Sequence, residues 1–218
     1  MPRKKKENPQ DATYWLFRPL NDEKRDWTET TDNWVNDYWE SKSHPHRKLI
    51  VNAVSYAIRH GSESLLEIGC NAGPNIAAMR DIINMRDDMI YGIDINADAI
   101  RKASEMLPAV NWSVGDVMNI PAKDKSIDLV LSDAVLMYVP DKDIEHVMDE
   151  ICRVAKKAVI LLEWHADKEK VEDFHWCRNY AKLLSDRGFV VDARKLTKEE
   201  WPTKTWLKHG MLYIAHLP

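Results

Sequence analysis

Short apolar segments alternate with segments of helical periodicity along most of the chain, and this alternation constrains the fold more than any other feature of the sequence. The apolar segments are apolar on both faces, not on every second residue. Such segments predict parallel strands in one sheet that helices cover on both sides. The predicted strands are Ser64–Ile68, Met89–Ile95, Val110–Val114, Ser126–Ser132, Ala158–Trp164, Phe189–Ala193 and Met211–Ala215.

Apolar spacing and end signals indicate the helices between these strands. Asn96 is a capping residue for a helix that runs to Leu107, and Gly61 ends a helix that Pro45 opens. Three further helices are predicted from about Pro74 to Ile83, over Asp141–Val154, and from about Lys168 to Arg187.

The chain is predicted to form one main domain with an N-terminal addition. Residues 1–12 are expected to be disordered, and tryptophan and tyrosine are frequent from there to residue 45. Within this stretch Trp34, Val35, Tyr38 and Trp39 share one face of a helix. We therefore expect residues 1–45 to form a tail and an aromatic-rich helical lid, and residues 46–218 to form the ligand-binding domain.

Charge and cysteine content argue against several classes of protein. The 218 residues carry a net charge of −4, which gives no reason to expect a nucleic acid as partner. The three cysteines are odd in number and lack a C-x-x-C spacing, which argues against a disulfide framework and a structural zinc. No apolar run is long enough to cross a bilayer. We expect a cytoplasmic protein without a membrane segment or a metal ion.

The stretch Leu65–Gly73 places a tight loop between a buried strand and a helix. A dinucleotide-binding loop would read G-x-G-x-x-G and would hold a pyrophosphate at the helix N-terminus. Here Glu67 stands at the strand end, and the spacing is E-x-G-x-N-x-G. Because a carboxylate repels a diphosphate and pairs with an ammonium group, the sequence favours a phosphate-free ligand that carries an amine.

Acidic residues also end the next two predicted strands. Asp94 can accept hydrogen bonds from both hydroxyls of a ribose when no 2′-phosphate is present. Asp116 can accept a hydrogen bond from an exocyclic adenine amine. Since ligands of open α/β sheets bind at the carboxyl ends of the strands, Glu67, Asp94 and Asp116 are expected to line one site.

These motifs, together with the run from Asp128 to Val139, resemble the successive motifs of class I S-adenosylmethionine-dependent methyltransferases, and of their small-molecule, type 11-like branch in particular. The resemblance covers residues 46–164 well and implies a Rossmann-like seven-stranded sheet in the order 3-2-1-4-5-7-6, with strand 7 antiparallel. It implies S-adenosyl-L-methionine as cofactor. The implied cofactor-binding residues are Glu67, Gly69, Asn71 and Gly73 for the methionine part, Asp94 and Ile95 for the ribose, Asp116 and Val117 for the adenine, and Ser132 along the cofactor.

Asn71 is a departure from the family's pattern, because a glycine usually stands in the middle of this loop. Asparagine tolerates left-handed backbone better than other non-glycine residues, so we expect the loop to keep its shape. Its side chain is also long enough to contact the cofactor.

The acceptor side is less well defined by the sequence. A general base is needed only if the acceptor must lose a proton, and the candidates for catalysis are His165 and Asp133. Each has an alternative role, as a surface histidine that caps a helix or as a hydrogen-bonding loop residue. Candidate substrate-binding residues are Trp15, Trp34, Tyr38, His46, Tyr138 and Trp206. Of these, Trp15, Trp34, Tyr38 and Trp206 could equally pack the lid onto the domain, and His46 could lie at a solvated helix start.

The predicted function is therefore methyl transfer from S-adenosylmethionine to a small molecule such as a metabolite, a sugar or a natural product. Two alternatives stay open. One is a methyltransferase of a macromolecule, either tRNA or a protein. The other is a non-catalytic cofactor-binding scaffold, because a fold does not guarantee chemistry. The acceptor atom and the oligomeric state do not follow from the sequence.

Overall fold

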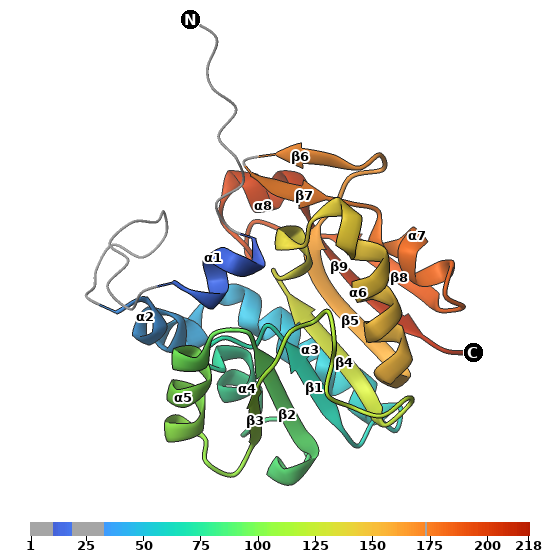
Figure 1. The fold of residues 1–218 in the computed structure, drawn as a ribbon. Coiled ribbons are helices and arrows are strands. Elements are labelled where there is room, and N and C mark those ends of the chain that lie inside the picture. The colour runs from blue at the N-terminus through green and yellow to red at the C-terminus, as the bar shows by residue number, and fades with distance from the viewer. Residues whose placement is uncertain (1–10, 19–32, 173) are drawn as a thin grey trace, which may run out of the picture.

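A computed structural model describes residues 11–18, 33–172 and 174–218 of the chain. Seven strands form one sheet in the order β3-β2-β1-β4-β5-β9-β8 (Figure 1). Strands β1 to β5 pair in parallel, and β9 is antiparallel to both β5 and β8. The strands are β1 (Leu65–Ile68), β2 (Ile90–Asp94), β3 (Asn111–Val114), β4 (Ile127–Asp133), β5 (Ala155–Trp164), β8 (Val190–Lys195) and β9 (Gly210–His216).

The predicted fold class is confirmed, because β8 and β9 are the sixth and seventh strands of this sheet and reproduce the order 3-2-1-4-5-7-6. The predicted cap is also present, since the Asn96 side chain accepts a hydrogen bond from Ala99 N. The helices are α1 (Ala12–Leu16), α2 (Trp34–Glu40), α3 (Pro45–Arg59), α4 (Pro74–Met79), α5 (Ala97–Met106), α6 (Asp141–Val154), α7 (Tyr180–Ser185) and α8 (Lys204–His209), with short 3-10 turns η1 (Ser41–Ser43), η2 (Asp87–Met89) and η3 (Leu136–Tyr138).

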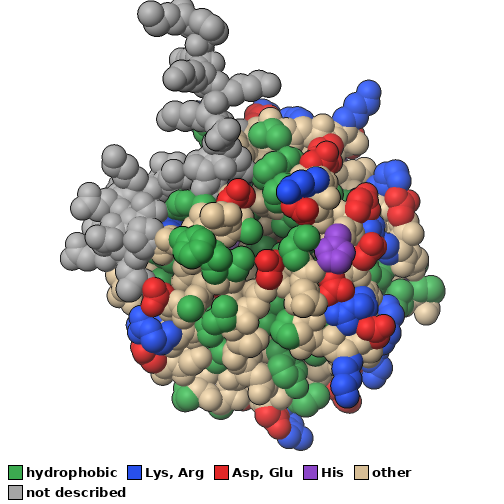
Figure 2. Space-filling view, viewed as in Figure 1, with side chains coloured by type: hydrophobic (Ala, Val, Ile, Leu, Met, Phe, Trp, Pro, Cys, Tyr) green, Lys and Arg blue, Asp and Glu red, His purple; other side chains and the backbone are tan. Residues whose placement is uncertain are grey.

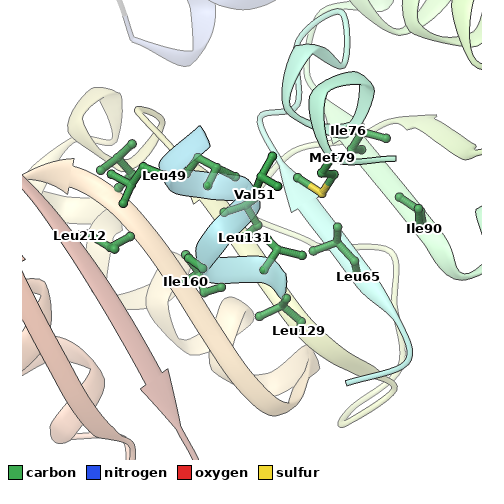
Figure 3. Packing of buried hydrophobic residues seen from close by; sticks show 14 of the residues in the cluster. Leu49, Val51, Leu65, Ile76, Met79, Ile90, Leu129, Leu131, Ile160 and Leu212 are labelled. Carbon is green, nitrogen blue, oxygen red and sulfur yellow. The ribbon is translucent and has the colours of Figure 1, made fainter. Parts of the chain in front are cut away.

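Helices cover both faces of the sheet, and each face has its own hydrophobic core. Helices α2 to α5 supply one cluster of buried residues, and α6 and α7 supply the other. Figure 3 shows Leu49 and Val51 of α3 lying over Leu131 of β4 and Ile160 of β5. Because the central strands are buried on both faces, their near-continuous apolar sequence is the expected one.

The predicted long helix from Lys168 to Arg187 is wrong. Its first half forms a hairpin of β6 (Lys170–Glu172) and β7 (His175–Cys177), and only α7 is helical. Arg178 N donates to Trp164 O at 3.1 Å, and Ala166 N donates to Arg178 O at 3.3 Å. This pairing beyond the end of β5 supplies tertiary partners that override the local helical preference. Helix α7 then begins where the Asn179 side chain accepts from Lys182 N.

The N-terminal helices lie against the end of the sheet at which β1, β2 and β4 terminate (Figure 1). Asn96 Nδ2, just beyond β2, donates to Trp15 O at 2.9 Å, and the Trp15 ring contacts Tyr138 beyond β4. Figure 2 shows hydrophobic side chains gathered near this region, whereas Lys, Arg, Asp and Glu gather over α6 and α7. Residues 1–10 of the tail predicted over residues 1–12, and residues 19–32 of the predicted lid, lie outside the described part of the chain. The last two residues of that tail are ordered, because Asp11 caps α1 and Ala12 begins it.

Two observations bear on the expectations from composition. Cys70, Cys152 and Cys177 are buried free thiols. Among the residues that the structure describes, no helix combines the length and the apolar character that a membrane crossing requires.

Candidate functional site

The loop between β1 and α4 turns through three residues with left-handed backbone. Gly69 has φ 62°, Asn71 has φ 50° and Gly73 has φ 78°. The expectation that Asn71 adopts the left-handed conformation is therefore confirmed. Its side-chain oxygen accepts from Ala72 N at 2.7 Å, so in this structure the amide supports the loop itself.

Gly69 is a position where only glycine fits, for two separate reasons. A Cβ there would be strained by the positive φ and would also overlap the Val135 side chain. We expect Gly69→Ala to lower the free energy of unfolding by about 2–4 kcal/mol in a urea titration. Gly188→Ala is the matched control, because Gly188 also has positive φ but no atom within 4 Å of the added Cβ, and it should cost only about 1 kcal/mol. Equal losses for both variants would contradict the packing argument.

Glu67 ends β1 with its carboxylate almost completely buried, at 2% exposure. One oxygen, Oε1, accepts from Asn75 Nδ2 at 2.7 Å, whereas Oε2 is buried and has no hydrogen-bond partner among the residues that the structure describes. Burial raises the pKa of Glu67 to about 8, and the nearby Asp133 carboxylate adds to the increase. A buried acceptor of this kind is costly unless a cation or a donor meets it.

Asp133 ends β4 and shares the Asn75 amide with Glu67. Its Oδ2 accepts from Arg47 Nη1 at 2.7 Å, from Asn75 Nδ2 at 2.9 Å and from His46 Nε2 at 3.2 Å. Burial acts to raise the pKa of Asp133, but these partners outweigh it and lower the pKa to about 2. Asp133 is therefore an ionised carboxylate at all ordinary pH values. Its second oxygen, Oδ1, is buried and meets no hydrogen-bond donor within residues 11–18, 33–172 and 174–218.

His46 and His44 extend this polar chain from Asp133 toward the surface. The Nδ1 atoms of the two rings face each other, and the His46 ring stacks on Trp201 with centroids 4.0 Å apart. Burial lowers the pKa of His46, and burial together with the neighbouring His46 and Arg47 lowers that of His44 to about 4. Near neutral pH both rings are therefore uncharged.

The two other predicted acidic residues lie at the end of β2, which pairs with β1, and just beyond β3, which pairs with β2. Asp94 accepts from Asn71 N and from Asn96 N, each at 2.8 Å. Burial raises the pKa of Asp94, although these hydrogen bonds act to lower it. Asp116, just beyond β3, accepts from Met118 N at 2.9 Å. Ile95 and Val117 follow the two acids directly and are half-buried. The structure thus brings the acids after β1, β2 and β3 to one edge of the sheet.

His165 and Ser132 lie in different surroundings from the other predicted site residues. The His165 ring contacts Tyr213 Oη at 2.7 Å and Asp167 Oδ1 at 3.1 Å. Tyr213 belongs to the core on the α6 and α7 side of the sheet, whereas His46 belongs to α3 on the other side. The structure therefore does not bring His165 to Asp133. Ser132 is fully buried and donates to Glu163 Oε1 at 2.8 Å.

Glu163 is a functional candidate that the sequence reasoning missed. It is fully buried at the end of β5, and its Oε1 accepts from Ser132 Oγ and from the backbone N atoms of Val135 and Leu136, while Oε2 accepts from Met137 N. Burial raises its pKa to about 7. An acidic residue inside the apolar run of β5 was the available signal. Its role in the structure is to fix the segment that follows β4.

Eight rings follow one another around this end of the sheet in an unbroken series of contacts, which we call the aromatic belt. Neighbouring centroids lie between 3.8 and 6.2 Å apart. The predicted substrate-binding residue Tyr38 lies next to the belt, with its ring 5.9 Å from Trp34. The belt consists, in order of contact, of Trp34, Trp15, Tyr138, His175, Trp164, Trp206, Trp201 and His46.

Comparison with known proteins shows that the sequence is similar to those of methyltransferases. Residues 65–158 match a family described as a methyltransferase domain. Over 169 residues the chain is 31% identical to norajmaline N-methyltransferase of Rauvolfia serpentina. The aligned region covers 67% of this chain and 56% of that protein. The chain spans only 37%, 56% and 27% of the lengths of the first three curated relatives that it matches.

Solved structures share the fold at low sequence identity. Magnesium protoporphyrin IX methyltransferase from Synechocystis PCC 6803, solved with bound SAM, is 15% identical, has a TM-score of 0.64 and covers 95% of each chain. A putative methyltransferase in complex with the Haloferax volcanii Trm112 methyltransferase activator is 17% identical, has a TM-score of 0.61 and covers 84% of this chain and 93% of that one.

Proposed function

We propose that this chain, which carries a class I S-adenosylmethionine-dependent methyltransferase domain, transfers the methyl group of S-adenosylmethionine to a small-molecule acceptor at the carboxyl edge of its sheet. The observation that carries the proposal is the buried, unpartnered Glu67 Oε2 beside the β1–α4 loop. When bound, the cofactor supplies an activated methyl group on a sulfonium sulfur.

The residues present fit this cofactor. Its ammonium group would meet Glu67, and in doing so it would supply the cation that the buried carboxylate lacks. Gly69, Asn71 and Gly73 would let the methionine part lie close to the backbone. Ser132 would act indirectly, since its hydroxyl is bound to Glu163.

The nucleoside would lie along the ends of β2 and β3. Asp94, with Ile95 beside it, would accept from the ribose hydroxyls, and Asp116 with Val117 would hold the adenine. Asp94 uses one lone pair of each oxygen for a backbone N–H, so each oxygen keeps acceptor capacity for a ligand.

The acceptor would lie between the cofactor and the aromatic belt. Trp15, Trp34, Tyr38, His46, Tyr138 and Trp206 would line or close this space, with residues 1–45 as lid and residues 46–218 as the methyltransferase domain. A small acceptor is supported by the name of the norajmaline relative and by the net charge of −4, which does not favour a polyanion. Of the two candidates for catalysis, Asp133 would lie nearer this space, because it bonds to His46 of the belt, whereas the His165 ring contacts Tyr213 on the α7 side.

Two measurements test the proposal. Isothermal titration of the full chain with S-adenosylhomocysteine should show micromolar binding, and NADH should show none. Incubation with methyl-labelled S-adenosylmethionine and separate metabolite, RNA and protein fractions of a cell extract should label a metabolite. Absence of S-adenosylhomocysteine binding would refute the cofactor assignment, and label in RNA or protein alone would refute the small-molecule acceptor.

A further inference from the structure

A cationic side chain of the protein itself lies on the aromatic belt. The Cζ atom of Arg18 is 4.4 Å from the Trp34 ring centroid and 5.1 Å from that of Trp15. It also lies 5.6 Å from the ring centroid of Tyr14. Distances below 6 Å from a ring face are those of attractive cation–π contacts. This part of the belt is therefore complementary to a positive charge.

Asp133 adds an ionised carboxylate to the same region, and the Arg47 guanidinium balances part of its charge. Its Oδ2 accepts from Arg47, His46 and Asn75, and its Oδ1 is buried with no hydrogen-bond partner in the described part of the chain. Tyr38 lies between the aromatic belt and Asp133. Its ring contacts Trp34, and the charges of Arg18 and Asp133 both act on the pKa of its phenol. The acceptor side thus combines electron-rich ring faces with an ionised carboxylate.

Three titratable groups near this space, Asp133, His46 and His44, are poorly suited to removing a proton from a hydroxyl group. Asp133 has a lowered pKa, and burial leaves the rings of His46 and His44 weakly basic. A general base works best with a pKa near the operating pH. Transfer to a hydroxyl oxygen needs such a base, whereas a neutral amine offers its lone pair without one. An amine that is protonated in solution must release that proton to the solvent before the transfer.

We propose that the acceptor is an amine, and that the aromatic belt and Asp133 stabilise the positive charge that its nitrogen gains. This inference rests on the proposed function. The nitrogen lone pair forms a bond to the methyl carbon while the carbon–sulfur bond breaks, and the electron pair of that bond stays on sulfur. The positive charge moves from sulfur to nitrogen, so surroundings that favour a cation at the nitrogen favour the transition state.

The proposal is tested with a quaternary ammonium probe, which resembles a methylated amine product. Choline and its neutral isostere 3,3-dimethylbutan-1-ol are titrated into the full chain, with and without saturating S-adenosylhomocysteine, and tryptophan fluorescence is recorded. Choline should bind at least about tenfold more tightly than the neutral alcohol. Equal or weaker binding of choline would overturn the proposal.

Three variants separate the belt from general effects of mutation. Trp15→Leu and Asp133→Asn should each reduce the preference for choline by about fivefold or more. The matched control is Trp39→Leu, because Trp39 is a buried tryptophan of α2 outside the belt and should keep the preference. Arg18→Gln should tighten choline binding, since the guanidinium and the probe compete for the same rings. An unchanged preference in Trp15→Leu together with Asp133→Asn would contradict the assigned site.

The rival explanation is that Asp133 serves the cofactor alone. In that case Asp133→Asn would weaken S-adenosylhomocysteine binding and leave the choline preference intact, which would count against the amine site. Failure of the proposed function can be told apart from failure of the amine site. If the protein does not bind S-adenosylhomocysteine, the proposed function fails, whereas the choline titration without S-adenosylhomocysteine still measures whether the belt binds a cation.

Discussion

Replacing Asp94 with alanine is expected to weaken S-adenosylhomocysteine binding by about a hundredfold. Asp94 ends β2 with one acceptor position on each oxygen available to a ribose, and each charge-assisted hydrogen bond contributes about 1.5–3 kcal/mol. Because both bonds are lost together, the combined cost is about 3 kcal/mol, which corresponds to about two orders of magnitude in Kd. Isothermal titration at constant pH and salt measures the change.

The control for this prediction must separate ligand contacts from loop support, since Asp94 also accepts from Asn71 N and Asn96 N. Asp94→Asn keeps the shape and one acceptor oxygen, so it should fall between the wild-type protein and Asp94→Ala in affinity. Asp128→Asn alters an acid at the opposite end of the sheet, where Asp128 accepts from Glu63 N and pairs with Lys157, and should leave the affinity unchanged. Wild-type affinity in a folded Asp94→Ala protein would remove Asp94 from the site.

The sheet and the β1–α4 loop followed from the sequence because local chemistry determines them. The strands of β1, β2 and β4 are buried on both faces, so their apolar runs are visible without knowledge of any partner. The left-handed turn at Asn71 likewise depends on the residue type and its neighbours. The hairpin of β6 and β7 did not follow, because the backbone partners that extend it, Trp164 and Ala166, lie on a different segment.

The polar connections of the candidate site also depend on contacts between distant segments. Arg47 and Asp133 are 86 positions apart, and Asn75 joins Asp133 to Glu67 only after α4 has packed against β1 and β4. The sequence indicated Asp133 and His46 as separate candidates but gave no sign of their hydrogen bond. The aromatic belt is a similar case, since its members come from segments between residues 15 and 206.

Cofactor binding should depend on pH through Glu67. In the empty protein Glu67 has a raised pKa of about 8, so near pH 6.5 it is mostly protonated and neutral. An ammonium group favours the ionised carboxylate, so binding should release a proton, and Kd should fall by up to about tenfold per pH unit between pH 6 and pH 7.5. Titrations in buffers of different ionisation enthalpy measure the released proton. In Glu67→Gln this pH dependence should disappear, and binding at pH 7.5 should be at least about tenfold weaker than in the wild-type protein. If the Kd of this variant still depends on pH, another group releases the proton.

The same substitution should affect stability in the opposite direction. The folded empty protein keeps the Glu67 proton up to a pKa of about 8, whereas the unfolded chain releases it near the ordinary value of 4.5. The free energy of unfolding should therefore fall as the pH rises from 4.5 to 8, by up to about 1.4 kcal/mol per pH unit, and Glu67→Gln should remove this loss and raise Tm at pH 8.

Glu163→Gln provides the contrast that makes the stability result interpretable. Glu163 is also a buried strand-end glutamate with a raised pKa, but both of its oxygens accept hydrogen bonds from Ser132 and the backbone beyond β4. An amide in its place would direct an N–H group toward another donor, so this variant should lower Tm. Glu67 has an oxygen that no group in the described part of the chain satisfies, whereas both oxygens of Glu163 accept hydrogen bonds. If the free oxygen of Glu67 is reserved for a ligand, Glu67→Gln should be more stable than the wild-type protein and Glu163→Gln less stable. A loss of stability in both variants would mean that Glu67 is a structural residue.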